Sequence, residues 1–149
     1  MDTSDGRDPF RLSRFVEAQE RDYDTALAEI RAGEKVSHWM WYIFPQIAGL
    51  GASPTSRFYA ITGVDEARAY LDHPVLGPRL RACAEALLAL QGRTAVDVFG
   101  GVDAMKLQSS ATLFAAVDLP GSVFHRLLDL YFGGDRDPRT VARLTPSSC

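Results

Sequence analysis

The segment from Ser37 to Gln46 constrains the fold more than any other part of the chain. It reads Ser-His-Trp-Met-Trp-Tyr-Ile-Phe-Pro-Gln, and as a helix it would be apolar on nearly every side. Such a helix has to be buried, and each aromatic ring adds roughly 150–250 Å² to the area that must be covered. Pro45 disfavours helical backbone at Phe44, so the helix is expected to stop near there. The segment predicts a short helix at or beside the centre of a core.

The composition is that of a globular domain large enough to enclose this helix. The chain has 149 residues, of which 46% are hydrophobic and 23% charged. These values exclude a disordered chain, a collagen-like repeat and a disulfide-stapled miniprotein. The formal net charge is -3, whereas nucleic-acid binders usually carry a basic excess. We therefore expect no nucleic-acid partner.

The chain shows no sequence signal for export, for membrane insertion or for a metal site. No apolar stretch follows a basic start, and the longest apolar run is far shorter than the roughly 20 residues of a membrane span. Two cysteines, Cys83 and Cys149, are too few for a secreted disulfide framework, and the three histidines lie far apart. We expect a cytoplasmic protein with no membrane partner, no structural metal and no cofactor.

Helical spacing of apolar residues recurs along the chain, and the nearest strand candidate, 57–61, is as easily one helical turn. These patterns predict an all-α, single compact domain of about seven or eight short helices over residues 8–144, with 1–7 and 145–149 as flexible tails. Asp8-Pro9 is expected to start the first helix and Gly33 to end it. Further helices are expected at 64–71, 75–90, 95–99, 102–117, 123–132 and 138–144.

Several segments besides the aromatic one give the chain a family resemblance. They are Asp8-Pro9-Phe10, Arg14-Phe15, Gly49-Leu50-Gly51, Tyr70-Leu71, His73 to Leu80, Phe99-Gly100, Asp103, Lys106, Ser109-Ser110, Thr112 to Phe114, and Tyr131 to Gly134. In this order they resemble the bacterial domain-of-unknown-function 1810 family, sometimes mislabelled calpastatin. The resemblance implies a compact, mainly α-helical fold without an established activity. A protease-inhibitor role has no physical support, because calpastatin's inhibitory segments are disordered and polar, whereas this chain is globular.

Two positions depart from the pattern of that family. The family often has Arg directly before the tyrosine found here at Tyr59, but Phe58 holds that place and Arg57 lies one residue earlier. Ala111 replaces a common methionine, which indicates a change in packing.

A looser similarity concerns the stretch from Leu87 to Gly92, followed by Phe99-Gly100 and Asp103. This layout resembles helical domains linked to NAD and ADP-ribose chemistry.

The aromatic segment has two interpretations. In the first, its rings are core. In the second, one or two of them line a pocket and stack on a planar ligand such as a base or nicotinamide. Trp39 and Trp41 are two residues apart and cannot share a helix face, so if one ring is core the other points elsewhere. His38 precedes them and is either a structural histidine or a general acid or base, since imidazole titrates near neutrality.

The loop after the aromatic rings supplies further candidates for ligand binding. Gln46 and the glycines of 49–51 form either an ordinary turn or a place where backbone approaches a ligand closely. Tyr59 is a further ligand-binding candidate.

A second polar group lies further along the chain at Asp103, Lys106, Ser109 and Ser110. Their spacings of three and four residues place them on one helix face. One interpretation is an exposed ion pair with serines packed against another helix. In the other, Lys106 binds an anion such as phosphate, Asp103 orients or activates water, and either serine hydrogen-bonds the ligand.

Two functions follow from these alternatives. The first is a small-molecule pocket for a planar anionic ligand, a nucleotide or an ADP-ribose derivative. If the protein is an enzyme, N-glycosidic hydrolysis is expected, with Asp103 as base, His38 as proton donor and Lys106 as phosphate contact. The second is a non-catalytic protein-protein interaction module. The first requires His38, Asp103 and Lys106 to converge on one pocket of about 300 Å³ or more; enzymatic activity and oligomeric state stay open.

Overall fold

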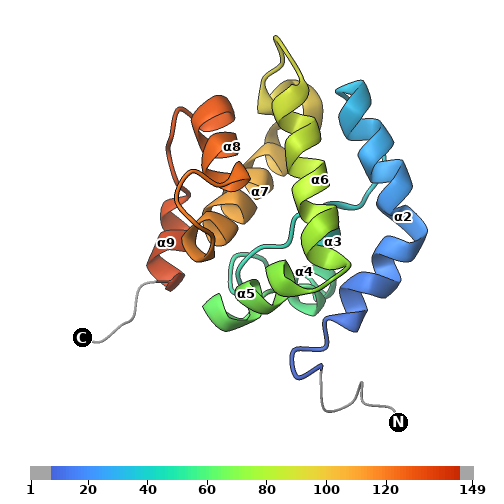
Figure 1. Ribbon diagram of the computed structural model, residues 1–149, viewed down its shortest axis with the longest axis vertical. Coiled ribbons are helices and arrows are strands. Elements are labelled where there is room, and N and C mark those ends of the chain that lie inside the picture. Colours follow the sequence, from blue (N-terminus) through green and yellow to red (C-terminus); the bar gives the residue numbers. More distant parts are fainter. Residues whose placement is uncertain (1–7, 145–149) are drawn as a thin grey trace.

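The computed structural model describes residues 8–144, which contain eight helices (Figure 1). The helices are α2 (Ser13–Ala32), α3 (Met40–Ile43), α4 (Pro54–Phe58), α5 (Val64–Asp72), α6 (Leu76–Ala89), α7 (Ala95–Val117), α8 (Val123–Phe132) and α9 (Pro138–Leu144). Within this described part no strand forms, and an isolated parallel bridge joins Ile47 to Ile61. The predicted all-α fold is confirmed. The predicted tails, 1–7 and 145–149, lie outside the described residues.

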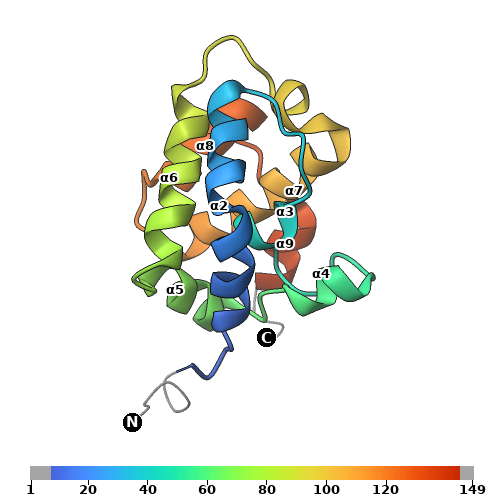
Figure 2. The same cartoon turned by 90° about the vertical axis from the view of Figure 1, so that its right-hand side faces the viewer.

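Helix α7 occupies the middle of the arrangement and packs on α5, α8 and α9. Helix α6 packs on α2, α5 and α8, so α2 and α6 run side by side along one flank (Figure 1). The short helix α4 stands out from the body of the molecule, close to the lower end of α2 and opposite α6 in Figure 2. No helix among residues 8–144 is both long and apolar enough to cross a membrane.

Local sequence signals fix most helix ends. Thr94 and Asp97 form a reciprocal capping box at the start of α7, and the Ser122 hydroxyl accepts a hydrogen bond from the backbone N–H of His125 at the start of α8. Gly33 and Gly133 end α2 and α8 with positive φ angles of 78° and 62°. The two helices expected at 95–99 and 102–117 are one element with a kink at Gly100.

The predicted start of the first helix at Asp8-Pro9 is wrong. Helix α2 begins at Ser13, because the Asp8 carboxylate reaches over an intervening turn and accepts hydrogen bonds from the backbone N–H groups of Leu12 (2.6 Å) and Ser13 (3.1 Å). Burial alone would raise the pKa of Asp8, but these hydrogen bonds outweigh it and lower the pKa. The charged residues 20–22 lie within this one unbroken helix.

The aromatic segment lies in the core, as its apolar character predicts. Its helix, α3, is only four residues long, and the side chains of Trp39 and Phe44 on either side of it are buried. Both rings pack edge-on against Phe99, each with a centroid separation of 6.2 Å. Trp41 is only partly buried, so the two tryptophans point to different surroundings, as their spacing requires.

Candidate functional site

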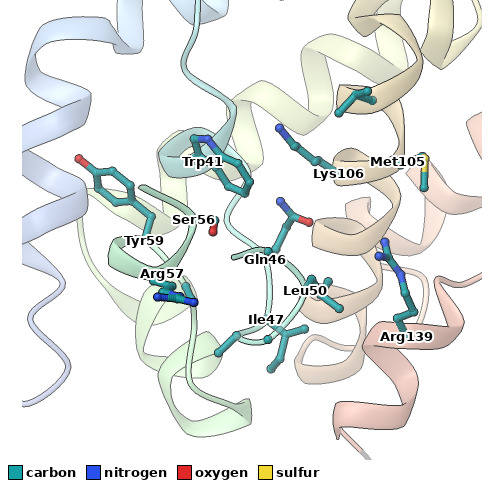
Figure 3. Close-up of a pocket in the computed structure, with 15 residues that line it drawn as sticks. Trp41, Gln46, Ile47, Leu50, Ser56, Arg57, Tyr59, Met105, Lys106 and Arg139 are labelled. Atoms are coloured by element: carbon teal, nitrogen blue, oxygen red, sulfur yellow. The ribbon is translucent and has the colours of Figure 1, made fainter. Parts of the chain in front are cut away.

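A pocket of about 310 Å³ lies beside the partly buried Trp41 (Figure 3). Its walls come from α3, the loop that follows, α4 and the residues after it, the middle of α7, and the start of α9. The lining residues are Trp41, Gln46, Ile47, Ala48, Gly49, Leu50, Gly51, Ser56, Arg57, Tyr59, Ala60, Val102, Met105, Lys106 and Arg139. The pocket thus joins segments that are far apart in the sequence.

Backbone pairing holds the loop wall in place. The N–H of Ile61 donates to the carbonyl of Gln46 (2.9 Å), and the N–H of Ala48 donates to the carbonyl of Ile61 (2.8 Å). This pairing ties the loop after α3 to the segment after α4. The backbone at Gly51 passes close to Ser56 and Trp41, which requires a glycine. A Cβ at this position would lie 2.8 Å from the Ser56 side chain and 3.7 Å from the Trp41 ring.

The pocket is strongly basic, although the chain as a whole is acidic. Arg57, Lys106 and Arg139 line it, and none of the lining residues named above is Asp or Glu. Lys106 is 3.2 Å from Asp103, and Arg139 is 3.5 Å from Asp137. Within residues 8–144, Arg57 has no ion-pair partner. The cationic lining favours an anionic ligand.

Lys106 connects the pocket to a charged cluster behind it. Its ammonium group lies 4.1 Å from the centroid of the Trp41 ring and contacts Asp103. Figure 3 shows the Lys106 side chain pointing toward Trp41. The other Asp103 oxygen is 2.9 Å from Lys35 Nζ, which in turn lies over the Trp39 ring. Asp103 therefore holds two lysines, one facing each tryptophan.

The two lysines also set the protonation of Asp103. Burial alone would raise the pKa of this carboxyl, but the hydrogen bonds and charges of Lys35 and Lys106 outweigh burial and lower it. A carboxylate stabilised in this way is a weak base. Asp103 is not among the residues that line the pocket.

Comparison with known proteins places the chain in a family. Residues 9–144 match the family described as "Protein of unknown function (DUF1810)". The chain belongs to the DUF1810 family. This family member resembles the crystal structure of the conserved hypothetical protein Rv1873 from Mycobacterium tuberculosis, with 49% sequence identity and a TM-score of 0.90 over 92% of this chain and 98% of that one. Curated proteins yield no match.

In this DUF1810 structure, four of the predicted ligand-binding residues line the pocket. They are Trp41, Gln46, Tyr59 and Lys106. Gln46 and Tyr59 lie on either side of Trp41 in Figure 3, and Lys106 reaches toward the tryptophan from α7. The side-chain amide of Gln46 makes no hydrogen bond to another described residue. Its lack of a partner leaves it available to a ligand.

Trp39, Ser109 and Ser110 lie in the core rather than in the pocket lining. The indole N–H of Trp39 donates to Glu29 (2.9 Å), and the Ser109 hydroxyl donates to Asp137 (2.8 Å). Asp137, directly before α9, holds the Ser109 side chain, and both serines are buried, so their spacing from Lys106 does not bring them to the pocket.

His38 is exposed and does not line the pocket either. His38, Asp103 and Lys106 therefore do not converge on one pocket as expected. Only Lys106 lines the pocket. Asp103 contacts Lys106 but is not part of the lining. The physical reason is that His38 precedes the buried Trp39, which faces away from the pocket.

Two pocket cations, Arg57 and Arg139, were not among the predicted site residues. Arg139 lies on α9, which Asp137 anchors to α7 through Ser109, so only the tertiary structure brings it near Trp41. Arg57 was noticeable in the sequence as a departure from the family pattern. Among the described residues no cluster of three or more His, Cys, Asp or Glu side chains is arranged to hold a metal ion.

Proposed function

We propose that the protein binds a small, planar and anionic molecule of the nucleotide type in the pocket beside Trp41. The observation that carries the proposal is the lining itself, in which Arg57, Lys106 and Arg139 share the pocket wall with Trp41 and no acidic residue is present. Guanidinium and ammonium groups form charge-assisted hydrogen bonds with phosphate oxygens, which are stronger than neutral ones. A phosphate in this pocket would pair with Arg57, which has no ion-pair partner among residues 8–144.

The aromatic and amide groups supply the part of the site that recognises a ring. Trp41 and Tyr59 present aromatic surface on which a base can stack. The free amide of Gln46 offers both donors and an acceptor to the edge of a base. Val102 and Met105 are 69% and 56% exposed and add apolar surface to the wall. A purine monophosphate combines the chemistry that these groups match.

The proposal is for binding rather than hydrolysis. A general base must come within hydrogen-bond reach of its proton, directly or through one water. His38 lies outside the pocket wall, and the Asp103 carboxylate is bound by two ammonium groups. Neither group is placed to activate water against a ligand stacked on Trp41.

Tryptophan fluorescence tests the proposal directly. The chain has two tryptophans, so Trp39→Phe leaves Trp41 as the sole reporter, and circular dichroism checks that this variant is folded. We expect AMP to quench the emission saturably, and adenosine, which lacks the phosphate, to bind more weakly. Binding should weaken as ionic strength rises, because the ligand is held by partly exposed charges.

The matched variants are Arg57→Ala and Arg126→Ala in the same background. Arg57 lines the pocket, whereas Arg126 is an exposed arginine on α8 that pairs with Glu85. We expect Arg57→Ala to weaken AMP binding about tenfold, which corresponds to one charge-assisted contact, and Arg126→Ala to leave it unchanged. No saturable quenching by AMP, or equal effects of the two substitutions, would overturn the proposal and favour the interaction module.

A further inference from the structure

A second hollow adjoins the pocket at Arg57. Its volume is about 530 Å³, and it lies between the turn that precedes α2 and the helix α4. Its walls are Pro9, Phe10, Arg11, Arg14, Pro54, Arg57, Phe58, Ala60, Thr62 and Glu66. We call it the α4 groove. Arg57 and Ala60 belong to the walls of both the groove and the pocket.

The α4 groove is held together by one guanidinium group. Arg14 donates to the backbone carbonyls of Phe10 (2.5 Å), Phe58 (2.7 Å) and Ala60 (2.9 Å) and forms an ion pair with Glu66 (2.9 Å). These bonds tie the turn before α2 to the chain around α4. The two sides of the groove are therefore fixed relative to each other before any ligand arrives.

The groove repeats the chemistry of the pocket. Phe58 is 47% exposed and Phe10 is partly buried, so aromatic surface is available for stacking. Its single acidic residue, Glu66, is already paired with Arg14. Arg11 and Arg57 have no ion-pair partner among residues 8–144. The groove, like the pocket, favours a ring and an anion.

The backbone at Arg11 is unusual in a way that concerns the groove. Its φ of 54° is the only positive value at a non-glycine residue between positions 8 and 144, a conformation that such residues rarely adopt. It sits in the turn where Asp8 caps α2 and where the Arg11 carbonyl accepts from Arg14 (3.0 Å). Hydrogen bonds to the side chains of Asp8 and Arg14 therefore hold the turn that carries Arg11.

We propose that the natural ligand is a dinucleotide, with two planar rings joined by a diphosphate, that spans the pocket and the α4 groove. One ring stacks on Trp41 and the other on Phe58, and the diphosphate passes Arg57, the cation shared by the two hollows. Arg11 supplies further positive charge on the groove side. This inference rests on the proposed function, because it names the ligand class of the same site.

The test compares the affinities of AMP and of NAD, a diphosphate-linked dinucleotide, by isothermal titration calorimetry on the full chain. We expect NAD to bind at least tenfold more tightly than AMP. Arg11→Gly removes the guanidinium while preserving the positive φ, and Phe58→Leu removes the exposed ring. Each should reduce the affinity for NAD several-fold and leave that for AMP unchanged, whereas Arg126→Ala should alter neither.

The possible outcomes distinguish dinucleotide binding from the binding of a mononucleotide in the pocket alone. If AMP binds but NAD binds no more tightly, the dinucleotide is wrong and the monophosphate pocket stands. The same conclusion follows if the groove substitutions reduce the affinities for AMP and NAD equally, or reduce neither affinity. If neither ligand binds the wild-type chain, the proposed function fails together with the inference.

Discussion

Among single residues, Glu29 has the most consequential set of contacts outside the pocket. Its carboxylate accepts hydrogen bonds from the backbone N–H groups of Val36 (2.8 Å) and Ser37 (2.9 Å), from the Ser37 hydroxyl (2.6 Å) and from the indole of Trp39. Burial raises the pKa of Glu29, but these hydrogen bonds outweigh it and lower the pKa to about 2. They fix the turn that leads into α3, and therefore the position of Trp41.

Glu29 makes folding stability depend on acid. Its pKa is lower in the folded chain than the ordinary value of 4.5, so its contribution is complete above about pH 4.5 and is lost as the pH falls toward 2. We expect Glu29→Gln to destabilise the protein by about 1–3 kcal/mol at pH 7, the range for losing bonds to a charged group. Urea denaturation at pH 7 and pH 3 measures both effects.

Glu17→Gln is the matched control, because Glu17 is an exposed carboxylate on the same helix. The difference in stability between the two variants should be large at pH 7 and smaller at pH 3. Equal stabilities at pH 7 would show that the hydrogen bonds to Glu29 do not stabilise the turn.

At the scale of the elements, the kink in α7 lets one helix serve two purposes. Gly100 has φ 81° and ψ 167°, so the helix changes direction after Phe99. The first part places Phe99 against Trp39 and Phe44 in the core, and the second part carries Lys106 to the pocket. A straight helix would turn one of these two faces away.

The adjacent glycines Gly100 and Gly101 give a paired test of the kink. A Cβ at either position would meet no atom within 4 Å, so space does not distinguish them. Gly100→Ala forces an L-residue into backbone that only glycine adopts readily and should destabilise the chain by about 1–3 kcal/mol. Gly101→Ala, in helical backbone, should stabilise it by roughly 0.5–1 kcal/mol. Thermal denaturation of the two variants checks the opposite signs, and shifts of the same sign would contradict this account.

For the molecule as a whole, the fold could be predicted because its signals are local. Thr94 with Asp97, and Ser122 with Gly133, mark helix ends through bonds to residues only a few positions away. The start predicted at Asp8 was wrong because its side chain caps a helix that begins five residues later, at Ser13, rather than at the next residue. The apolar character of the aromatic segment predicted a buried helix, but it could not show that only four residues are helical.

The candidate site was less predictable, because it exists only in the folded molecule. Helical spacing placed Ser109 and Lys106 on one helix and left open whether the serine packs against another helix or binds a ligand; only the folded chain shows that Asp137 holds it. Arg139 carries no local mark of a binding residue and reaches the pocket through the docking of α9. The spacing of Trp39 and Trp41 did predict that the two rings would not share surroundings, but not that Trp41 would line a pocket.

Whether a planar ring that carries a phosphate binds beside Trp41 is tested most directly by a crystal structure of the protein with AMP. We expect the base to stack in the pocket beside Trp41 and the phosphate to lie within hydrogen-bond distance of at least one of Arg57, Lys106 and Arg139. An empty pocket at saturating AMP, or AMP bound at a different surface, would contradict this expectation.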